Sequence, residues 1–230
     1  MKLIKMICLI AAVGVAGCLI AADEKAAETP PAKPAKDTKA DLTPGPGGWM
    51  TLFDGKTLGR WKPSDYAPND KIEVKDGQLR LGIGEPMAGI TWDGEPPVRI
   101  NYEIELEAMR TEGHDFFCGL TFPVGKDPCT LVCGGWGGTV VGLSSIDGFD
   151  ASENQTSQSM SFEDKRWYKI RVKVMKDRIE AWIDDKRIVN LETAEHKIGI
   201  RMEVEPSVPL GVATWYTGSA LRNIRMRKLD

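Results

Sequence analysis

The chain has 230 residues and a formal net charge of −3, with basic and acidic side chains spread along its whole length. The sequence shows no basic stripe, so it lacks the charge pattern that is typical of nucleic-acid-binding proteins. Its length suits one folded domain together with additional segments at the start of the chain.

The pattern of residues 1–22 predicts an export signal. A basic start precedes an apolar run, residues 6–17, which is too short to span a bilayer comfortably. The run ends in Val-Ala-Gly before Cys18, which is the pattern of a bacterial lipoprotein whose lipidated cysteine becomes the mature N-terminus. The alternative is an ordinary signal peptide cut near Ala22. Both alternatives predict an exported, periplasmic or cell-envelope protein, and a lipid on Cys18 would be its only attachment to a membrane.

Residues 23–48 predict a disordered linker. This segment is rich in proline, alanine and lysine, mixes both charges, and has almost no large apolar side chain. Such a composition cannot bury enough apolar surface to order the chain. We therefore expect one folded domain over residues 49–230.

The segments 101–108, 169–174 and 179–184 alternate apolar and polar residues with a period of two. That period indicates antiparallel strands with one face buried, and turn pairs such as Asp54-Gly55 and Asp76-Gly77 separate the strand-like segments. No segment of the body has a sustained helical period. The fold class predicted from this pattern is an all-β, antiparallel two-sheet sandwich or jelly roll. The residues expected to face its core are Ile170, Val172, Val174, Ile179, Ala181 and Ile183.

Polar side chains within these strands form rows. Glu103, Glu105 and Glu107 make an acidic row, and Lys169, Arg171 and Lys173 make a basic one. We expect these charges to be solvated or paired across strands. Trp182 lies on the polar side of its strand, where an indole either offers a stacking surface to a sugar or is covered by a loop.

Three cysteines of the body fall close together, at Cys118, Cys129 and Cys133. A Cys129–Cys133 disulfide and three buried thiols are both open alternatives. A zinc site would require a fourth ligand and a closer cysteine spacing.

The segment GGWGGTVVGLSSIDGFDASEN, residues 134–154, is the most unusual of the chain. Its glycines lead into a strand-like run, which argues against a phosphate loop, since such a loop leads into a helix. Asp147, Asp150 and Glu153 lack the spacing of an EF-hand, but their oxygens suit a divalent cation such as calcium held by an irregular loop. Asn154 is expected to cap this acidic loop.

A Ser-His-Asp set can be written from Ser144 or Ser145, His114 and Asp115, but the sequence has no nucleophile elbow. His114 opens the strand nearest the expected cleft, so it is a candidate substrate-binding residue.

Three segments of the body carry a family resemblance. The opening GWMTLFDGKTL at residues 48–58, followed by Trp61, resembles the opening motif of the 3-keto-disaccharide hydrolase domain. RWYKI with RIEAWID, at residues 166–170 and 178–184, and ALRNIR at residues 220–225 are similar to later strands of the same family. The resemblance spans nearly the whole body and implies a concanavalin-like, laminin-G-like jelly roll.

The chain departs from that family at two places. Typical members carry an NSG segment followed by an aromatic residue and an arginine on a central strand. Here the corresponding segment, residues 115–122, reads DFFCGLTF and contains no arginine. A glutamine that is common before the last strand is replaced by Thr214-Trp215.

The resemblance implies a carbohydrate ligand and an enzyme that cleaves 3-keto-disaccharides or related glycosides. A ketone acidifies the neighbouring C–H bond, so one base can begin an elimination. We expect this base among Glu153, Asp150 and Asp147, with Glu153 first because its side chain is the longest. The expected substrate-binding residues are Trp136, Trp182, Trp215, Asn154 and His114. A non-catalytic glycan-binding or adhesion module on the same sandwich is the alternative, and no protein partner is evident.

Overall fold

The computed structural model describes residues 42–66 and 72–230. The predicted signal peptide, the lipidation site Cys18 and most of the predicted linker lie outside the described residues, so they remain predictions. Before the predicted boundary at residue 49, Leu42 packs against the core and a short 3-10 turn, η1, spans Pro46–Gly48. Among the described residues, no helix has the length and apolar character needed to cross a membrane.

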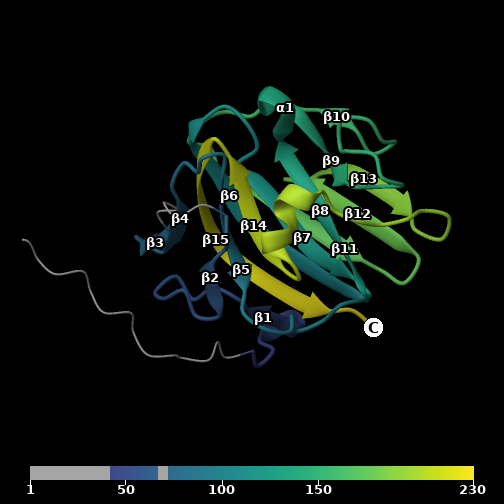
Figure 1. The fold of residues 1–230 in the computed structure, drawn as a ribbon. Helices are drawn as coiled ribbons and strands as arrows, with labels where there is room; N and C mark the ends of the chain where they lie inside the picture. The colour runs from purple at the N-terminus through teal and green to yellow at the C-terminus, as the bar shows by residue number, and fades with distance from the viewer. Residues whose placement is uncertain (1–41, 67–71) are drawn as a thin grey trace, which may run out of the picture. The chain divides into compact units, whose positions relative to one another are not determined.

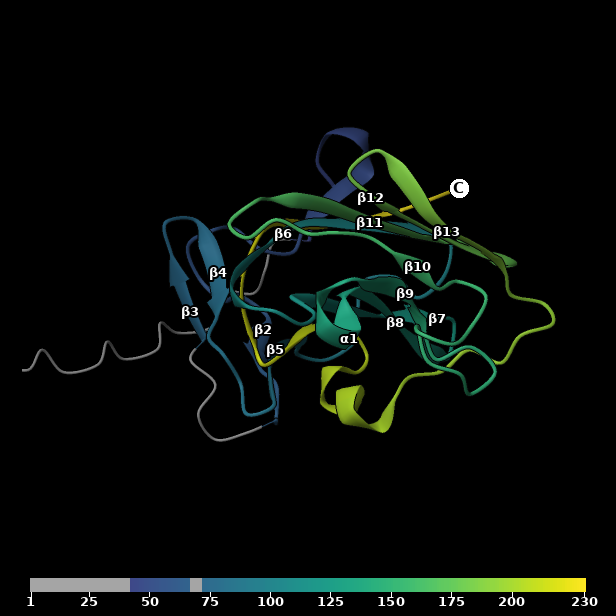
Figure 2. The ribbon, with the colours of Figure 1, turned by 90° about the horizontal axis from the view of Figure 1, so that it is seen from above.

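The described chain forms two antiparallel sheets that stack face to face, as Figures 1 and 2 show. The first sheet contains, in spatial order, β13 (Lys186–Glu192), β12 (Arg178–Ile183), β11 (Tyr168–Val174), β6 (Tyr102–Gly113), β15 (Thr217–Lys228), β4 (Gln78–Leu81) and β3 (Ile72–Lys75), and β1 (Trp49–Thr51) also pairs with β15. The second sheet contains β10 (Gln158–Ser159), β9 (Val140–Ser144), β8 (Asp127–Gly134), β7 (Cys118–Val124), β14 (Gly211–Trp215), β5 (Met87–Trp92) and β2 (Trp61–Pro63). The predicted all-β sandwich of the jelly-roll type is confirmed.

One hydrophobic core lies between the sheets. The predicted core side chains of β11 and β12 are all fully buried in it. Because side chains alternate across a strand, the same strands place Lys169, Arg171 and Lys173 on the outer face of the first sheet. Two short helices follow η1 along the chain: the one-turn helix α1 (Gly135–Gly138) and the 3-10 helix η2 (Met202–Ser207).

The three cysteines are free and buried. Cys118 and Cys133 lie directly opposite each other on β7 and β8, whereas Cys129 faces Phe122. Burial raises the pKa of the Cys129 thiol to about 12, which keeps the group neutral. Of the two alternatives left open by the sequence, the structure has three buried thiols.

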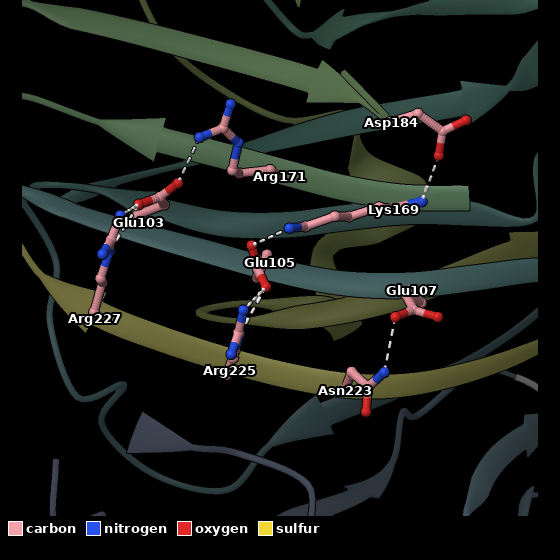
Figure 3. A network of polar contacts seen from close by, with 9 residues as sticks. All are labelled: Glu103, Glu105, Glu107, Lys169, Arg171, Asp184, Asn223, Arg225 and Arg227. Atoms are coloured by element: carbon pink, nitrogen blue, oxygen red, sulfur yellow. Dashed lines mark hydrogen bonds and ion pairs between the residues drawn. The ribbon is translucent and has the colours of Figure 1, made fainter. Parts of the chain in front are cut away.

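Glu103 and Glu105 of the acidic row on β6 are paired with cations on both sides, whereas Glu107, among the described residues, pairs only with Arg222 and Asn223 of β15 (Figure 3). Arg171 Nη1 and Arg227 Nε donate hydrogen bonds to the Glu103 carboxylate at 3.0 and 2.8 Å. Arg225 Nε donates to Glu105 at 2.6 Å, and Lys169 Nζ forms an ion pair with Glu105 at 3.2 Å. Lys169 and Arg171 reach diagonally, since their register partners are Glu107 and Glu105. Lys173 instead pairs with Glu180, which lies directly opposite it on β12. The expectation of cross-strand pairing is confirmed.

Glu103→Gln should lower the free energy of unfolding by about 3 kcal/mol, because the side chain is only 3% exposed and its loss leaves two cations without their shared carboxylate. Urea unfolding measures this. Glu73→Gln is the matched control, since Glu73 is 58% exposed and lies 3.9 Å from Arg80, and it should cost at most about 1 kcal/mol. Equal losses for the two variants would contradict the importance of burial here.

Candidate functional site

A cavity of about 260 Å³ opens on the outer face of the second sheet. Figure 2 shows η2 on this side, away from the first sheet. The cavity is lined by Met87, Asp115, Phe116, Thr130, Val132, Trp136, Ser144, Arg201, Glu203, Val204 and Trp215. Its lining therefore comes from strands β5, β8, β9 and β14 and from three loop or turn segments.

The cavity exists because the outer face of the second sheet has small side chains. In β7, the core side carries Leu120 and Phe122, whereas the outer side carries Gly119 and Thr121. β14 likewise places Ala213 on the outer face. Small residues on a sheet face leave space above the strands, and larger side chains around this space enclose it as a cavity.

One wall of the cavity is apolar and rigid. Met87, Val204 and Ala213 form a second hydrophobic cluster, against which Phe116 and Trp215 pack. Two polar contacts hold η2 on the sheet next to this cluster: Thr91 Oγ1 donates to the Pro206 carbonyl at 2.6 Å, and the Tyr66 hydroxyl lies 2.6 Å from Ser207 Oγ. The segment that begins at Arg201 is therefore fixed on strands rather than free in solvent.

Arg201 and Glu203 place charge in the cavity. Arg201 donates Nη2 to Glu203 Oε1 at 2.7 Å and Nε to Oε2 at 3.2 Å, and its Nη1 contacts Asp150 Oδ2. The hydrogen bond from Arg201 is the main cause that holds the pKa of Glu203 below its ordinary value of 4.5. The same bond raises the pKa of Arg201. The cavity thus holds a carboxylate that is ionised at neutral pH beside a permanent cation.

Trp136 reaches the cavity from a tight left-handed turn. Its φ is +49°, and the flanking Gly134 and Gly137 have φ values of +80° and +84°. Asp115 holds this turn, because its Oδ2 accepts the Gly137 amide at 2.9 Å and its Oδ1 accepts the Phe116 amide at 2.7 Å. Trp136 is 43% exposed, so part of the residue is accessible to a ligand.

The glycines around Trp136 serve the turn itself. A Cβ on Gly138 would lie 2.6 Å from the carbonyl oxygen of His114, and the φ of Gly138 is +107°. The close neighbour that excludes a side chain at Gly138 is therefore a backbone atom of the protein.

Ser144 supplies a polar group at the floor of the cavity. Its side chain is almost fully buried, and its Oγ has no hydrogen-bond partner among the described residues. A buried hydroxyl without a partner is unfavourable by about 1–3 kcal/mol, so such a group calls for an explanation. The Oγ atom itself has almost no accessible surface, so a ligand hydroxyl in the cavity would reach it only after a small shift of the lining.

The structure divides the predicted catalytic residues. Asp150 contacts Arg201 from outside the cavity. Asp147 accepts the Lys197 amide at 2.7 Å and lies 2.6 Å from His196 Nδ1, and the Lys197 bond is the main cause that lowers the pKa of Asp147. Glu153 is exposed and does not line the cavity. Asp147 therefore braces the loop, and only Asp150 is connected to the cavity.

The predicted ligand-binding residues are likewise divided. Trp136 and Trp215 line the cavity, whereas the exposed His114 does not. Asn154 is buried, and its amide bonds the Leu143 and Asp150 carbonyls at 2.7 Å each, so it fixes the loop from inside. Trp182 lies on the first sheet, where the Arg171 guanidinium covers it at 3.9 Å from the ring centre.

If the cavity cleaves the 3-keto glycosides that the family resemblance implies, Asp147→Asn and Glu153→Gln should leave kcat/KM unchanged, because neither side chain lines the cavity. Asp147→Asn should lower thermal stability slightly through the loss of its His196 and Lys197 contacts. Turnover of a 3-keto glycoside and thermal melting measure the two effects. A large fall in turnover for Glu153→Gln would place the reaction at the loop rim instead.

Sequence reasoning did not identify Arg201 and Glu203. They lie about 50 residues beyond the acidic loop that contains Asp150, and the fold alone brings them to it. The only local signal is their alternating spacing before Val204 and Pro206, which is weak. No group of three or more His, Cys, Asp or Glu side chains in the described part of the chain is arranged to hold a metal ion.

Comparison with known proteins places the chain among carbohydrate-related sandwiches. The family model for the 3-keto-alpha-glucoside-1,2-lyase-like domain matches residues 48–227. A search of curated proteins finds no significant match.

Similar solved structures share the fold at low identity. A candidate glycosyl hydrolase of Parabacteroides distasonis is 12% identical, with a TM-score of 0.52 over 80% of this chain and 95% of that one. Crh5 transglycosylase in complex with NAG is 12% identical, with a TM-score of 0.55 over 80% and 85% of the two chains. A sialidase is 9% identical, with a TM-score of 0.53, and the match covers 80% of this chain but 19% of the sialidase.

Proposed function

Because the chain belongs to the family of 3-keto-alpha-glucoside-1,2-lyase-like domains, we propose that it cleaves 3-keto glycosides in the cavity of the second sheet. The single observation that supports this site is the Arg201–Glu203 pair inside an aromatic-walled cavity. The pair joins an ionised carboxylate to a fixed cation. Removal of a proton next to a ketone requires both, a base for the proton and a cation for the enolate.

The proposed reaction begins at C2 of the sugar. Glu203 takes the C2 proton, and the electron pair of that C–H bond forms an enolate whose charge rests on the C3 oxygen. The enolate then expels the C1 substituent, which takes the proton from Glu203 and leaves as an alcohol, so the carboxylate is regenerated. A C1=C2 double bond remains, conjugated with the ketone. Addition of water across this double bond would complete a net hydrolysis.

Arg201 is the proposed stabiliser of the enolate. When Glu203 accepts the proton, the negative charge moves from the carboxylate to the sugar oxygen, and the guanidinium next to both keeps a partner throughout. Asp150 holds the third nitrogen of Arg201 and acts as a positioning residue. A preorganised cation lowers the barrier because it need not reorient during the reaction.

The remaining lining groups suit a pyranose ring. Trp136 and Trp215 offer apolar ring faces, and the Ser144 hydroxyl offers an unpaired donor and acceptor at the floor. Asp115 does not face the sugar as a base in this proposal, since its carboxylate oxygens already hold the Phe116 and Gly137 amides.

Hydrogen exchange tests this mechanism. The protein is incubated in D₂O with a 3-keto-disaccharide and with the same disaccharide carrying a 3-hydroxyl, in buffer with EDTA and in buffer with calcium. We expect cleavage of the keto sugar alone, deuterium at C2, and a slower rate when C2 carries deuterium at the start. Equal cleavage of the 3-hydroxyl sugar, or cleavage with no C2 isotope effect and no C2 exchange, would contradict an elimination.

A glycan-binding module is the second candidate function. The half-exposed indole of Trp136 favours it, because an open aromatic face binds sugar without requiring a base. In that case no keto sugar is cleaved, but one binds, and Trp136→Ala abolishes the binding measured by calorimetry.

A further inference from the structure

The outer face of the first sheet carries an excess of positive charge. We call it the basic face and define it by seven cations and four carboxylates that pair with one another: Lys169, Arg171, Lys173, Arg187, Arg222, Arg225 and Arg227 with Glu103, Glu105, Glu107 and Glu180. The cations outnumber the carboxylates here although the whole chain has a net charge of −3. Charge is therefore segregated to this side of the sandwich.

The excess of positive charge is larger at the accessible surface, because the carboxylates are more buried than the cations. The Glu103 and Glu105 side chains are 3% and 8% exposed, whereas Lys169 is 50% and Arg225 is 41% exposed. Figure 3 shows the carboxylates of Glu103 and Glu105 lying between cations of β11 and β15. A molecule that approaches this face meets guanidinium and ammonium groups first.

Indole rings hold the guanidinium groups in place. Arg171 stacks on Trp182 at 3.9 Å, Arg222 on Trp167 at 4.0 Å, and Arg225 and Arg227 lie 4.4 and 4.5 Å from the ring centre of Trp49. Such stacking fixes the planar fork of arginine before a ligand arrives, so less entropy is lost when it binds a carboxylate or sulfate. The partly buried indoles also place apolar edges among the charges.

A cavity of about 440 Å³ lies within this face, bordered by the cations Lys169 and Arg225 and by the carboxylates Glu105 and Glu107. Its volume falls in the range of small-molecule sites. Arg225 directs Nε and Nη2 to Glu105, and its Nη1 group donates to no acceptor within the described residues. Asn223, at a bulge of β15 with φ +54°, also borders the cavity. The cavity is therefore of mixed charge, and the Nη1 donors of Arg225 are the part of its lining that is available to an anionic group.

We propose that the basic face binds an acidic polysaccharide, a chain of pyranose rings that carry carboxylate or sulfate groups. The anionic groups pair with the exposed cations, and the C–H faces of the rings contact the indole edges. An extended polymer suits a sheet face that presents its cations along β11 and β15 in parallel rows. This surface is separate from the cavity of the second sheet, because the two lie on opposite outer faces of the sandwich.

The cations come from β11, β13 and β15, which explains why the sequence shows no basic stripe. Lys169, Arg171 and Lys173 are interrupted by core residues, and the β15 arginines lie about 50 residues later. Only the antiparallel pairing of these strands with β6 brings the charges together.

The test is a binding measurement with the full chain. Polygalacturonate supplies carboxylates, heparin supplies sulfates and dextran is the neutral control. The variant is Lys169→Gln/Arg171→Gln/Lys173→Gln, which removes the excess charge but leaves Arg225, Arg227 and Arg187 to pair with Glu105, Glu103 and Glu180. Lys62→Gln/Lys126→Gln/Lys197→Gln is the matched control, since it changes net charge equally and lies outside the basic face.

We expect the native chain to bind at least one acidic polymer and not dextran, with affinity that falls as salt rises. The β11 variant should bind roughly tenfold more weakly or worse, while the matched control binds as the native chain does. The double variant Lys169→Gln/Lys173→Gln keeps the Arg171–Trp182 stack and should show an intermediate loss with an unchanged melting temperature. Polygalacturonate and heparin then distinguish carboxylate from sulfate recognition.

Three results would overturn the proposal. The first is equal binding of acidic polymers by the β11 variant and the matched control. The second is binding of dextran as tight as that of the acidic polymers. The third is retention only on anionic lipid vesicles or DNA, which would assign the face to another class of partner.

Discussion

Glu203→Gln should lower kcat on a 3-keto glycoside by roughly two to four orders of magnitude, because an amide cannot accept the C2 proton. The change keeps the size of the side chain and one oxygen that can still accept from Arg201, so the fold and KM should change little. Steady-state kinetics by product detection measure kcat and KM separately. The C2 exchange in D₂O should fall in proportion to kcat, which a loss of binding alone would not cause.

Glu205→Gln is the matched control for this prediction. Glu205 also belongs to η2 and is exposed, but it does not line the cavity. It should therefore keep native kcat and KM. Native turnover in Glu203→Gln would rule out Glu203 as the base, and a comparable fall in Asp115→Asn would transfer the role to the other lining carboxylate.

The pH dependence follows from the pairing of Glu203. Arg201 lowers the pKa of Glu203 below its ordinary value of 4.5, so the basic form is present above that pH and is lost as pH falls through the lowered pKa. The acid limb of kcat/KM should accordingly lie below pH 4.5. In Arg201→Gln the limb should shift upward, because the main cause of the lowered pKa is gone.

The fold could be predicted from the sequence because its signals are local. The alternation in 169–174 and 179–184 fixes which side chains enter the core, and Ile170 and Ile183 face each other in register there. The same alternation fixed the outer row of cations. Local patterns could not give the diagonal pairing of Arg171 with Glu103, since that depends on the register and side-chain length across strands.

The candidate site was predicted only in part. Trp136 was predicted as a substrate-binding residue within the glycine-rich segment, and Trp215 stands where the family commonly has a glutamine. Both line the cavity. The acidic loop was conspicuous too, but its side chains serve the loop: Asn154 ties its carbonyls together and Asp147 joins it to residues 196–197. Charged residues close in sequence are often held by their own backbone, and sequence alone does not separate that use from catalysis.

Arg201 and Glu203 escaped prediction because their signal is entirely tertiary. The pair enters the cavity only because Thr91 and Tyr66 hold η2 against the sheet. The family resemblance drew attention to a missing arginine on the central strand, and residues 118–124 indeed carry none. In the structure an arginine lines the cavity from a different segment, at residue 201.

Arg201→Gln should lower kcat by roughly two to three orders of magnitude, because the enolate oxygen loses its fixed cation. Arg201→Lys should recover part of this loss, since an ammonium keeps the charge but lacks the planar fork that holds Glu203 and Asp150 together. The matched control is Arg99→Gln. Arg99 also donates Nε and Nη2 to one carboxylate, that of Glu95, but lies outside the cavity.

The double variant Arg201→Gln/Glu203→Gln separates a joint role from two independent ones. If the cation acts on the enolate that Glu203 generates, removal of both groups should lower kcat little more than Glu203→Gln alone, since residues that act as a unit are strongly non-additive. Effects on kcat that multiply would mean that Arg201 and Glu203 contribute independently to the rate. A native rate in Arg201→Gln, with C2 exchange intact, would show that another group stabilises the enolate and would remove Arg201 from the mechanism.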